Sequence, residues 1–199
     1  VIARPFIGEK GKFKRTYDRK DFGMKTPEGN ILELLNKNGF KTYGIGKIED
    51  LFGKDHLHKS KHTTGDEDGM KSLIESLENE KFNFTFINLV DCDMLYGHRE
   101  DPSGYAEGLR LIDRYLGRLL NIVSKDDLLL ITGDHGNDPT DGDTDHTREY
   151  VPIIAYSKTS LGSDLHTRNS FTDVGKTIAE YFKIENTIIG KSFLKDIIK

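Results

Sequence analysis

The chain has 199 residues, a formal net charge of -4 and a single cysteine, Cys92. This length is enough for one sizeable core with a small appendage. The negative charge argues against a basic face for nucleic acid, and the short aliphatic runs exclude a transmembrane helix. A lone cysteine cannot form an intramolecular disulfide and indicates a reducing, cytoplasmic compartment.

The first part of the chain predicts an edge strand followed by a polar segment. Residues 1–7 (VIARPFI) have strand character, and residues 8–27 are rich in Gly, Lys and Arg. The polar segment is either a linker or a basic patch facing an anion, and its composition favours the linker. Because no initiator Met precedes Val1, we expect the sequence to be part of a longer protein. Thr26 and Pro27 predict the start of the first helix.

Short apolar runs alternate with stretches of helical periodicity along the rest of the chain. The expected strands lie near residues 41–45, 83–90, 128–133 and 151–156. The expected helices run from 66 to about 79, from a Ser103 cap to about 123, from 172 to 182, and beyond Gly190. This alternation predicts an α/β fold with a mainly parallel sheet and helices on both faces.

Two polar stretches carry weaker signals. The segment Gly44 to Lys47 (GIGK) follows a strand, and its lysine could reach a phosphate. On spacing alone, a tight turn with a surface lysine is the better interpretation. Residues 54–66 hold three histidines interleaved with lysines that would repel a cation, so a mobile polar loop is favoured over a metal site at His56, His58 and His62.

The strongest functional signal lies between Leu128 and Tyr150. A buried strand ends at Asp134 and His135, and the following turn formers carry further acids and His146. A solvated acidic loop is the alternative interpretation. An EF-hand is excluded because its sixth position would be His146 and its twelfth Pro152. Since solubility does not require the histidines, we predict a metal site.

The strand near residues 83–90 repeats this pattern. It is followed by Asp91 and Asp93, and His98 comes five residues after Asp93. The carboxyl ends of parallel strands share one edge of a sheet, so the two sets of side chains can converge there. One of the two aspartates could instead serve in capping or turn chemistry. The candidate metal ligands are Asp93, His98, Asp134, His135 and His146.

These carboxylates and imidazoles suit manganese, zinc or iron better than magnesium. Five ligands exceed one tetrahedral site, which predicts two ions. Paired ions about 3.5–4 Å apart can clamp a phosphoryl group, so the chemistry expected is phosphoryl transfer or phosphoester hydrolysis. A single structural ion in a non-catalytic binding domain remains the alternative.

The order strand–Asp–His, strand–Asp–His and then a third His resembles the alkaline phosphatase superfamily. Within it, the whole chain resembles the phosphopentomutases, in the words VIARPFIGEKGKFKRT, GIGKI, NLVDCDMLYGHREDPSGY, LLLITGDHGNDPT and TDHTREYVPIIAYS. The spacing of five from Asp93 to His98 is also typical of this family, whereas alkaline phosphatases and cofactor-independent phosphoglycerate mutases typically have four.

The resemblance implies an alkaline-phosphatase-like core and a cytoplasmic isomerase of nucleoside and pentose phosphate metabolism. Such an enzyme exchanges phosphate between C1 and C5 of ribose or 2-deoxyribose by way of a phosphothreonine. The resemblance also implies two manganese ions, one held by Asp93, His98 and His146 and the other by Asp134 and His135. It further implies that Arg15 and Lys47 contact the substrate phosphate.

The family's nucleophilic threonine and a further Asp ligand lie in an N-terminal part that this sequence does not contain. Thr132, Thr144 and Thr147 lie near the predicted site but do not match the nucleophile. We therefore expect no catalytic nucleophile in this chain, and we expect the missing N-terminal part of the same protein to be its partner.

The expected domains follow from this resemblance. Residues 1–25 would be the end of a substrate-cap domain with its hinge, and residues 26–199 the carboxyl-terminal part of the metal-binding core. The alternatives are a metal-dependent phosphatase, phosphodiesterase or related phosphomutase of the same superfamily, and a non-catalytic metal-binding fragment. The isolated chain is expected to be inactive.

Overall fold

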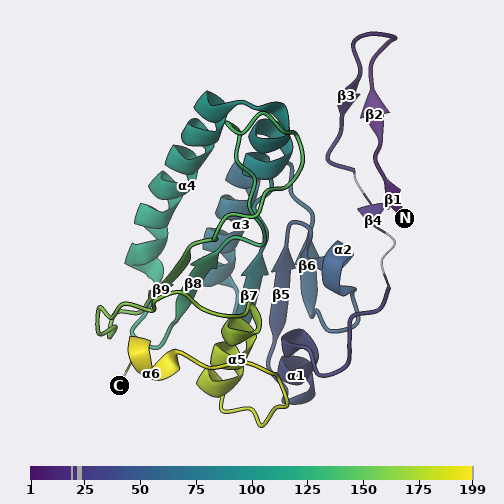
Figure 1. The fold of residues 1–199 in the computed structure, drawn as a ribbon. Coiled ribbons are helices and arrows are strands. Elements are labelled where there is room, and N and C mark those ends of the chain that lie inside the picture. The colour runs from purple at the N-terminus through teal and green to yellow at the C-terminus, as the bar shows by residue number, and fades with distance from the viewer. Residues whose placement is uncertain (19, 22–23, 199) are drawn as a thin grey trace.

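A computed structural model describes residues 1–18, 20–21 and 24–198 of the chain, which form an α/β core and a projecting arm (Figure 1). The core contains two sheets. The first has three parallel strands in the order β6 (Lys59–Lys61), β5 (Thr42–Ile45) and β7 (Phe84–Ile87). The second pairs β8 (Leu129–Thr132) with β9 (Ile153–Tyr156) in antiparallel fashion. Among the described residues, no strand ladder joins β7 to β8.

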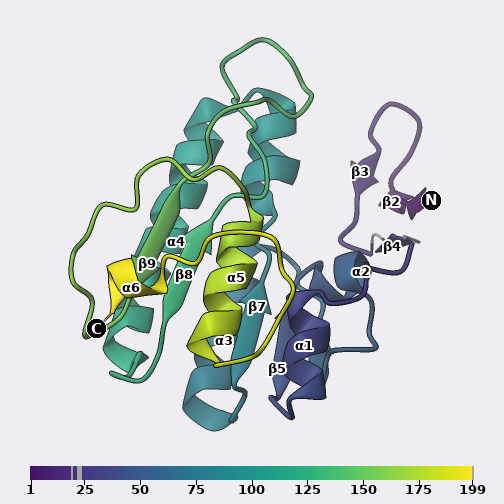
Figure 2. The same ribbon diagram turned by 60° about the horizontal axis from the view of Figure 1, so that its bottom comes forward.

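Helices cover both faces of these strands (Figures 1 and 2). One face carries the two long helices, α3 (Asp66–Asn79) and α4 (Pro102–Ile122). The opposite face carries α1 (Ile31–Lys37), α5 (Thr172–Tyr181) and α6 (Leu194–Ile197), while the short α2 (Ile48–Phe52) follows β5. The predicted α/β class is therefore confirmed. No helix in the described part of the chain has the length and apolar character that crossing a bilayer requires.

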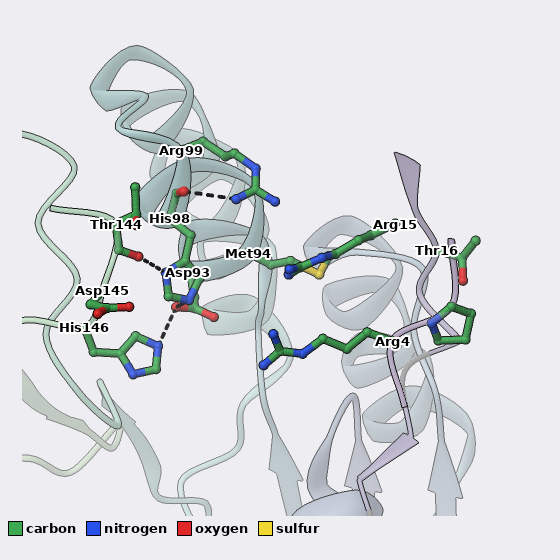
Figure 3. Close-up of a pocket in the computed structure, with 11 residues that line it drawn as sticks. Arg4, Arg15, Thr16, Asp93, Met94, His98, Arg99, Thr144, Asp145 and His146 are labelled. Carbon is green, nitrogen blue, oxygen red and sulfur yellow. Dashed lines mark hydrogen bonds and ion pairs between the residues drawn. The ribbon is translucent and has the colours of Figure 1, made fainter. Parts of the chain in front are cut away.

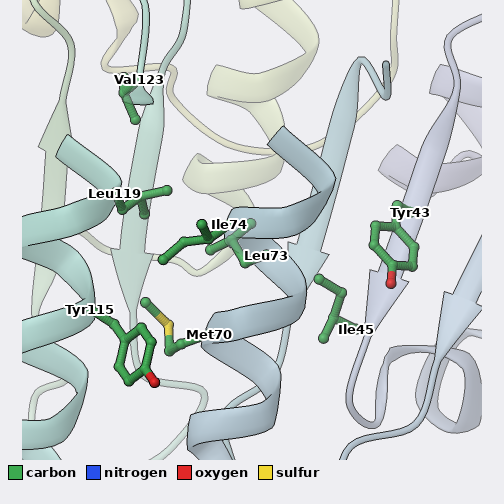
Figure 4. Close-up of a cluster of buried hydrophobic side chains, with 8 residues drawn as sticks. All are labelled: Tyr43, Ile45, Met70, Leu73, Ile74, Tyr115, Leu119 and Val123. Atoms are coloured by element: carbon green, nitrogen blue, oxygen red, sulfur yellow. The ribbon is translucent and has the colours of Figure 1, made fainter. Parts of the chain in front are cut away.

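A cluster of buried side chains joins β5 to α3 and α4 (Figure 4). Side chains alternate along a strand, so Tyr43 and Ile45 share one face of β5. They belong to one cluster with apolar side chains of the two helices and the residue after α4, namely Met70, Leu73, Ile74, Tyr115, Leu119 and Val123. This packing fixes β5 and β7, whose carboxyl ends point to the candidate site.

Two strand assignments differ from the expectation. Residues 54–66 were expected to form only a loop, but they contain β6, an edge strand with the sequence Lys-Ser-Lys. Lysines protect an edge strand from unwanted pairing and remove the apolar signal by which a strand is recognised. The last strand, β9, is antiparallel to β8 because residues 133–152 between them form no crossover helix.

Two helix starts also differ from the expectation. Helix α1 is capped by Asn30, whose side-chain oxygen accepts the Glu33 amide at 3.1 Å, and not by Thr26. Helix α4 is capped by Asp101, which accepts the Gly104 amide at 2.8 Å, with Pro102 in the first turn. In both cases a short polar side chain satisfies a free helix amide.

The arm consists of short antiparallel strands. In it β1 (Ile2–Ala3) pairs with β4 (Lys20–Asp21), and β2 (Phe6–Ile7) pairs with β3 (Lys14–Arg15). Pro5, which cannot donate a backbone hydrogen bond, separates β1 from β2, so the predicted single strand is broken. The segment 8–27 supplies the return strands and is thus more than a linker; its residues 19 and 22–23 lie outside the described part.

Candidate metal centre

The five predicted ligands lie on segments that follow two strands. Asp93 belongs to the π-helical turn η1 (Cys92–Tyr96) after β7, and His98 to the following 3-10 turn η2 (Gly97–Arg99). Asp134 and His135 follow β8, and His146 lies in the loop that leads to β9. The backbone of this loop is closed by a bridge between Gly136 and Thr147, which brings His146 back beside His135.

Asp93 is the centre of the cluster (Figure 3). Its Oδ1 lies 3.2 Å from the Nε2 of His98 and 3.2 Å from the Nε2 of His146. Donor atoms around a tetrahedral ion with bonds of about 2.1 Å are about 3.4 Å apart. The distance from Asp93 to each of these two histidines therefore fits a pair of ligands on one ion.

His135 and Asp134 lie next to this group. The rings of His135 and His146 are stacked with centroids 3.7 Å apart, and one ligand atom from each of Asp93, His135 and His146 lies within 4.8 Å of the others. The Oδ2 of Asp134 is 3.6 Å from the Nε2 of His135, and the Asp134 side chain is 68% exposed. The structure brings all five side chains to one edge of the fold, with Asp134 outermost.

Backbone carbonyls orient two of the histidine rings. The Nδ1 of His98 lies 2.5 Å from the Thr144 carbonyl oxygen, and the Nδ1 of His135 lies 3.1 Å from that of Gly136. A carbonyl oxygen only accepts, so the tautomer with its proton on Nδ1 satisfies this contact and leaves Nε2 available to bind a metal ion. A cation between the Nε2 lone pairs and carboxylates relieves their repulsion, and the donor set therefore fits a divalent metal.

Asn137 also contacts Asp93, although the sequence did not single it out. Its Nδ2 donates a hydrogen bond to the Asp93 Oδ1 at 2.7 Å. There is no room for a Cβ at Gly97, because that atom would lie 2.4 Å from the Asn137 side chain. The amide thus holds the Asp93 carboxylate in place, as partners of metal ligands commonly do. An amide side chain is not a typical ligand for these ions, so its type gave no signal.

The remaining aspartates of the acidic loop form turns. Asp138, Asp141 and Asp143 each accept the backbone amide two residues further on. Hydrogen bonds from the side chain and amide of Thr140 lower the pKa of Asp138. Such turns explain the acidic composition of the loop without an ion. Next to the candidate ligand Asp93, burial raises the pKa of the Cys92 thiol to about 11, which keeps the thiol protonated.

A pocket of about 510 Å³ lies between the Asp–His cluster and the arm (Figure 3). One side contains Asp93, His98 and His146, and the other lining residues are Arg4, Pro5, Arg15, Thr16, Met94, Arg99, Thr144 and Asp145. Three arginines from separate segments make this pocket suited to an anion that also contacts a metal.

The arginines of the pocket were only partly anticipated. Arg15 was predicted to contact phosphate and does line the pocket, whereas Arg4 and Arg99 were not identified. Both were visible in the sequence, one in the first strand and one directly after His98, but periodicity does not reveal which way a side chain points. Lys47, the N-cap of α2, is not among the described residues that line the pocket.

An α/β fold whose strand ends carry this Asp–His cluster defines a class of metal-dependent enzymes. The family model for the Metalloenzyme superfamily matches residues 30–186, and the chain belongs to this superfamily. All of its residues align with proteins named phosphopentomutase, at 46% identity in Anaeromyxobacter sp. (strain K) and Clostridium novyi and at 44% in Dictyoglomus turgidum. The chain spans 51% of each of these relatives, about half their length.

A solved structure supports the fold. The PH0037 protein from Pyrococcus horikoshii superposes with a TM-score of 0.50 at 21% identity, over 62% of this chain and 39% of its own. At this identity the likeness concerns the fold alone. Together with the superfamily match, it supports the alkaline-phosphatase-like core that the sequence resemblance implied.

Proposed function

We propose that this chain is part of a phosphopentomutase, an enzyme that interconverts the 1-phosphate and 5-phosphate of ribose or 2-deoxyribose. The observation that carries the proposal is the pocket between the Asp93 cluster and the arginines of the arm. It combines metal-ligating and phosphate-binding side chains in one space. The relatives aligned over the whole chain carry the name of this activity.

The proposed metal site keeps the assignment made from the sequence. Asp93, His98 and His146 would hold one manganese ion, and Asp134 and His135 the other, although other divalent ions suit the same donors. When bound, such ions supply electrostatic stabilisation to phosphoryl oxygens. The two 3.2 Å contacts of Asp93 support the first set. His135 lies 3.6 Å from Asp134 but also groups with Asp93 and His146 within 4.8 Å, so its place in the second set rests on the family resemblance.

The chain's own side chains would bind and orient the substrate. Arg4 and Arg15 point from the arm toward the cluster, and a guanidinium can bind a phosphate in bidentate fashion (Figure 3). Lys47, at the carboxyl end of β5, is proposed as a further phosphate contact. A sugar phosphate held from both sides would keep its phosphoryl group beside the cluster, which is the geometric requirement for transfer.

Two of the threonines near the site make hydrogen bonds within the fold. The Thr147 hydroxyl accepts the Asp138 amide at 3.1 Å, and the Thr132 hydroxyl donates to the Gly133 carbonyl at 3.2 Å. We place the phosphate-carrying threonine and one further Asp ligand in the other half of the protein. Residues 1–25 would then end a substrate-cap domain, and residues 26–199 would complete a cytoplasmic core enzyme.

The exposed arm supports the proposal of a missing partner segment. Phe6, Ile7 and Phe13 are each about 60% exposed there. Apolar side chains this exposed on a projecting arm are suited to contact with another part of the same protein. The remaining half of the polypeptide is the partner we propose.

The proposal predicts that the 199-residue chain binds Mn²⁺ but does not interconvert ribose 1-phosphate and ribose 5-phosphate, because no group in it carries the phosphoryl covalently. The full-length protein should catalyse this conversion with Mn²⁺. Both proteins are assayed with and without metal. Mutase activity in the 199-residue chain would contradict the assignment of the nucleophile, and release of inorganic phosphate by the full-length protein without isomerisation would favour a phosphatase.

Replacing Arg15 by Ala in the full-length protein should raise the KM for ribose 5-phosphate about tenfold, since one charge-assisted hydrogen bond is lost. Arg110→Ala is the matched control, because Arg110 pairs with Glu107 on α4 and does not line the pocket. Steady-state kinetics measure both variants. An unchanged KM for Arg15→Ala would exclude this residue from substrate binding.

A further inference from the structure

We infer that Asp66, the first residue of α3, is a positioning residue for the metal centre. It holds the segment that follows β7 and leads to Asp93 and His98. The inference rests on the proposed function where it treats Asp93 and His98 as ligands. The contacts of Asp66 itself belong to the fold and are independent of any bound ion.

Asp66, at the start of α3, and Asp91, after β7, bind each other's segments by reciprocal hydrogen bonds, an arrangement that we call the Asp66–Asp91 clasp. The Asp66 Oδ1 accepts the backbone amides of Val90 at 2.6 Å and Asp91 at 3.0 Å. In return, the Asp91 Oδ2 accepts the backbone amide of Asp66 at 2.8 Å. Three hydrogen bonds therefore join the start of α3 to the segment that follows β7, and each involves a carboxylate, which strengthens it.

The local backbone is built for this clasp. Gly65 has φ +144°, a conformation that disfavours other residues, and a Cβ there would lie 2.9 Å from the Asp91 Oδ2. Only glycine lets the Asp91 carboxylate approach the Asp66 amide this closely. Glycine and both aspartates thus form one unit.

Burial makes Asp66 unusual among the acids of this chain. Its residue is 1% exposed, and its Oδ2 has no hydrogen-bond partner in the described structure. An acid in the first helical turn commonly binds amides of its own helix, but the carboxylate of Asp66 binds amides of the segment that follows β7 instead. Burying a carboxylate costs free energy. The hydrogen bonds that offset this cost are made with the segment that leads to the proposed ligands.

The clasp is two residues away from the first ligand. Asp91 is the N-cap of η1, and the Met94 amide donates to the Val90 carbonyl at 2.8 Å across this turn. On the other side, α3 is anchored by Met70 and Leu73 in the buried cluster. Asp93 is therefore placed relative to the core by a short, hydrogen-bonded path that begins at Asp66.

The test compares three variants of the 199-residue chain by Mn²⁺ calorimetry and, without metal, by amide hydrogen exchange. Asp66→Ala should weaken Mn²⁺ binding about 10- to 100-fold, as for other residues that orient ligands, and should remove protection at the Val90 and Asp91 amides. Asp66→Asn should keep both, because its amide oxygen still accepts. Asp68→Ala is the matched control in the same helical turn, where Asp68 accepts the Thr64 amide, and should not change Mn²⁺ affinity.

Gly65→Ala is a second disruption that leaves both carboxylates in place. It should weaken Mn²⁺ binding in the same way, and thus tests the inference even if Asp66→Ala does not fold. Wild-type affinity and wild-type protection in a folded Asp66→Ala or Gly65→Ala variant would overturn the inference. If the unmodified chain binds no Mn²⁺, the proposed metal site fails, whereas hydrogen exchange at Val90 and Asp91 still decides whether Asp66 holds the segment that follows β7.

Discussion

Replacing Asp93 by Ala should weaken Mn²⁺ binding by the 199-residue chain by more than about 100-fold. The loss should exceed that caused by removing a residue that only orients a ligand. The Asp93 Oδ1 is the atom that approaches both His98 and His146 at 3.2 Å and also accepts the Asn137 amide. Removing it separates the imidazoles from their shared carboxylate. Isothermal calorimetry or the electron paramagnetic resonance of free Mn²⁺ measures the change.

Asp143→Asn is the matched control for this experiment. Asp143 lies in the same acidic loop, but its carboxylate accepts the Asp145 amide, a bond that the Asn oxygen preserves. Its affinity for Mn²⁺ should stay close to that of the unmodified chain. An equal loss in both variants would show that the loop binds ions through diffuse negative charge.

In the full-length protein, His146→Ala should remove most of the mutase activity.

The unfolding free energy of the metal-free chain should fall by about 3 kcal/mol as the pH rises from about 4 to above 6, because Asp66 loses its proton. Burial, together with the negative charge of Asp91, raises the pKa of Asp66 from 3.8 to about 6. The folded state then binds this proton more tightly than the unfolded state. The stabilisation is complete below the unfolded pKa and is lost as the pH rises through the folded one, and a pKa raised from 3.8 to about 6 corresponds to about 3 kcal/mol.

Urea denaturation at a series of pH values measures this dependence, and Asp66→Asn supplies the reference. Because Asn does not titrate, the difference between the two unfolding free energies removes the contributions of the histidines and other shared groups. The unmodified chain should lose stability relative to Asp66→Asn across this pH range. Parallel curves for the two proteins would show that the Asp66 carboxyl titrates normally.

The sequence by itself predicted the class of fold, which is confirmed, and the set of residues that form the candidate site. The 14 residues of α3 were predicted with their correct bounds, because helical periodicity is a local property. The repeated order of strand, acid and histidine predicted that Asp93, His98, Asp134, His135 and His146 would meet at one edge. Parallel strands direct their carboxyl ends the same way, so the meeting of these side chains follows from the alternation of strands and helices. The antiparallel pairing of β8 with β9 and the edge strand β6 do not follow from it.

The tertiary structure alone decided which partner each polar side chain found. Asn137 reaches Asp93 across 44 positions of sequence, and His146 reaches Asp93 across 53. Periodicity carries no information about contacts between residues this far apart. The same is true of the two aspartates after β7, of which Asp91 binds the start of α3 and Asp93 the histidines. Their chemistry is identical in the sequence, and only the direction in which the folded backbone turns each carboxylate separates the structural role of Asp91 from the place of Asp93 in the candidate site.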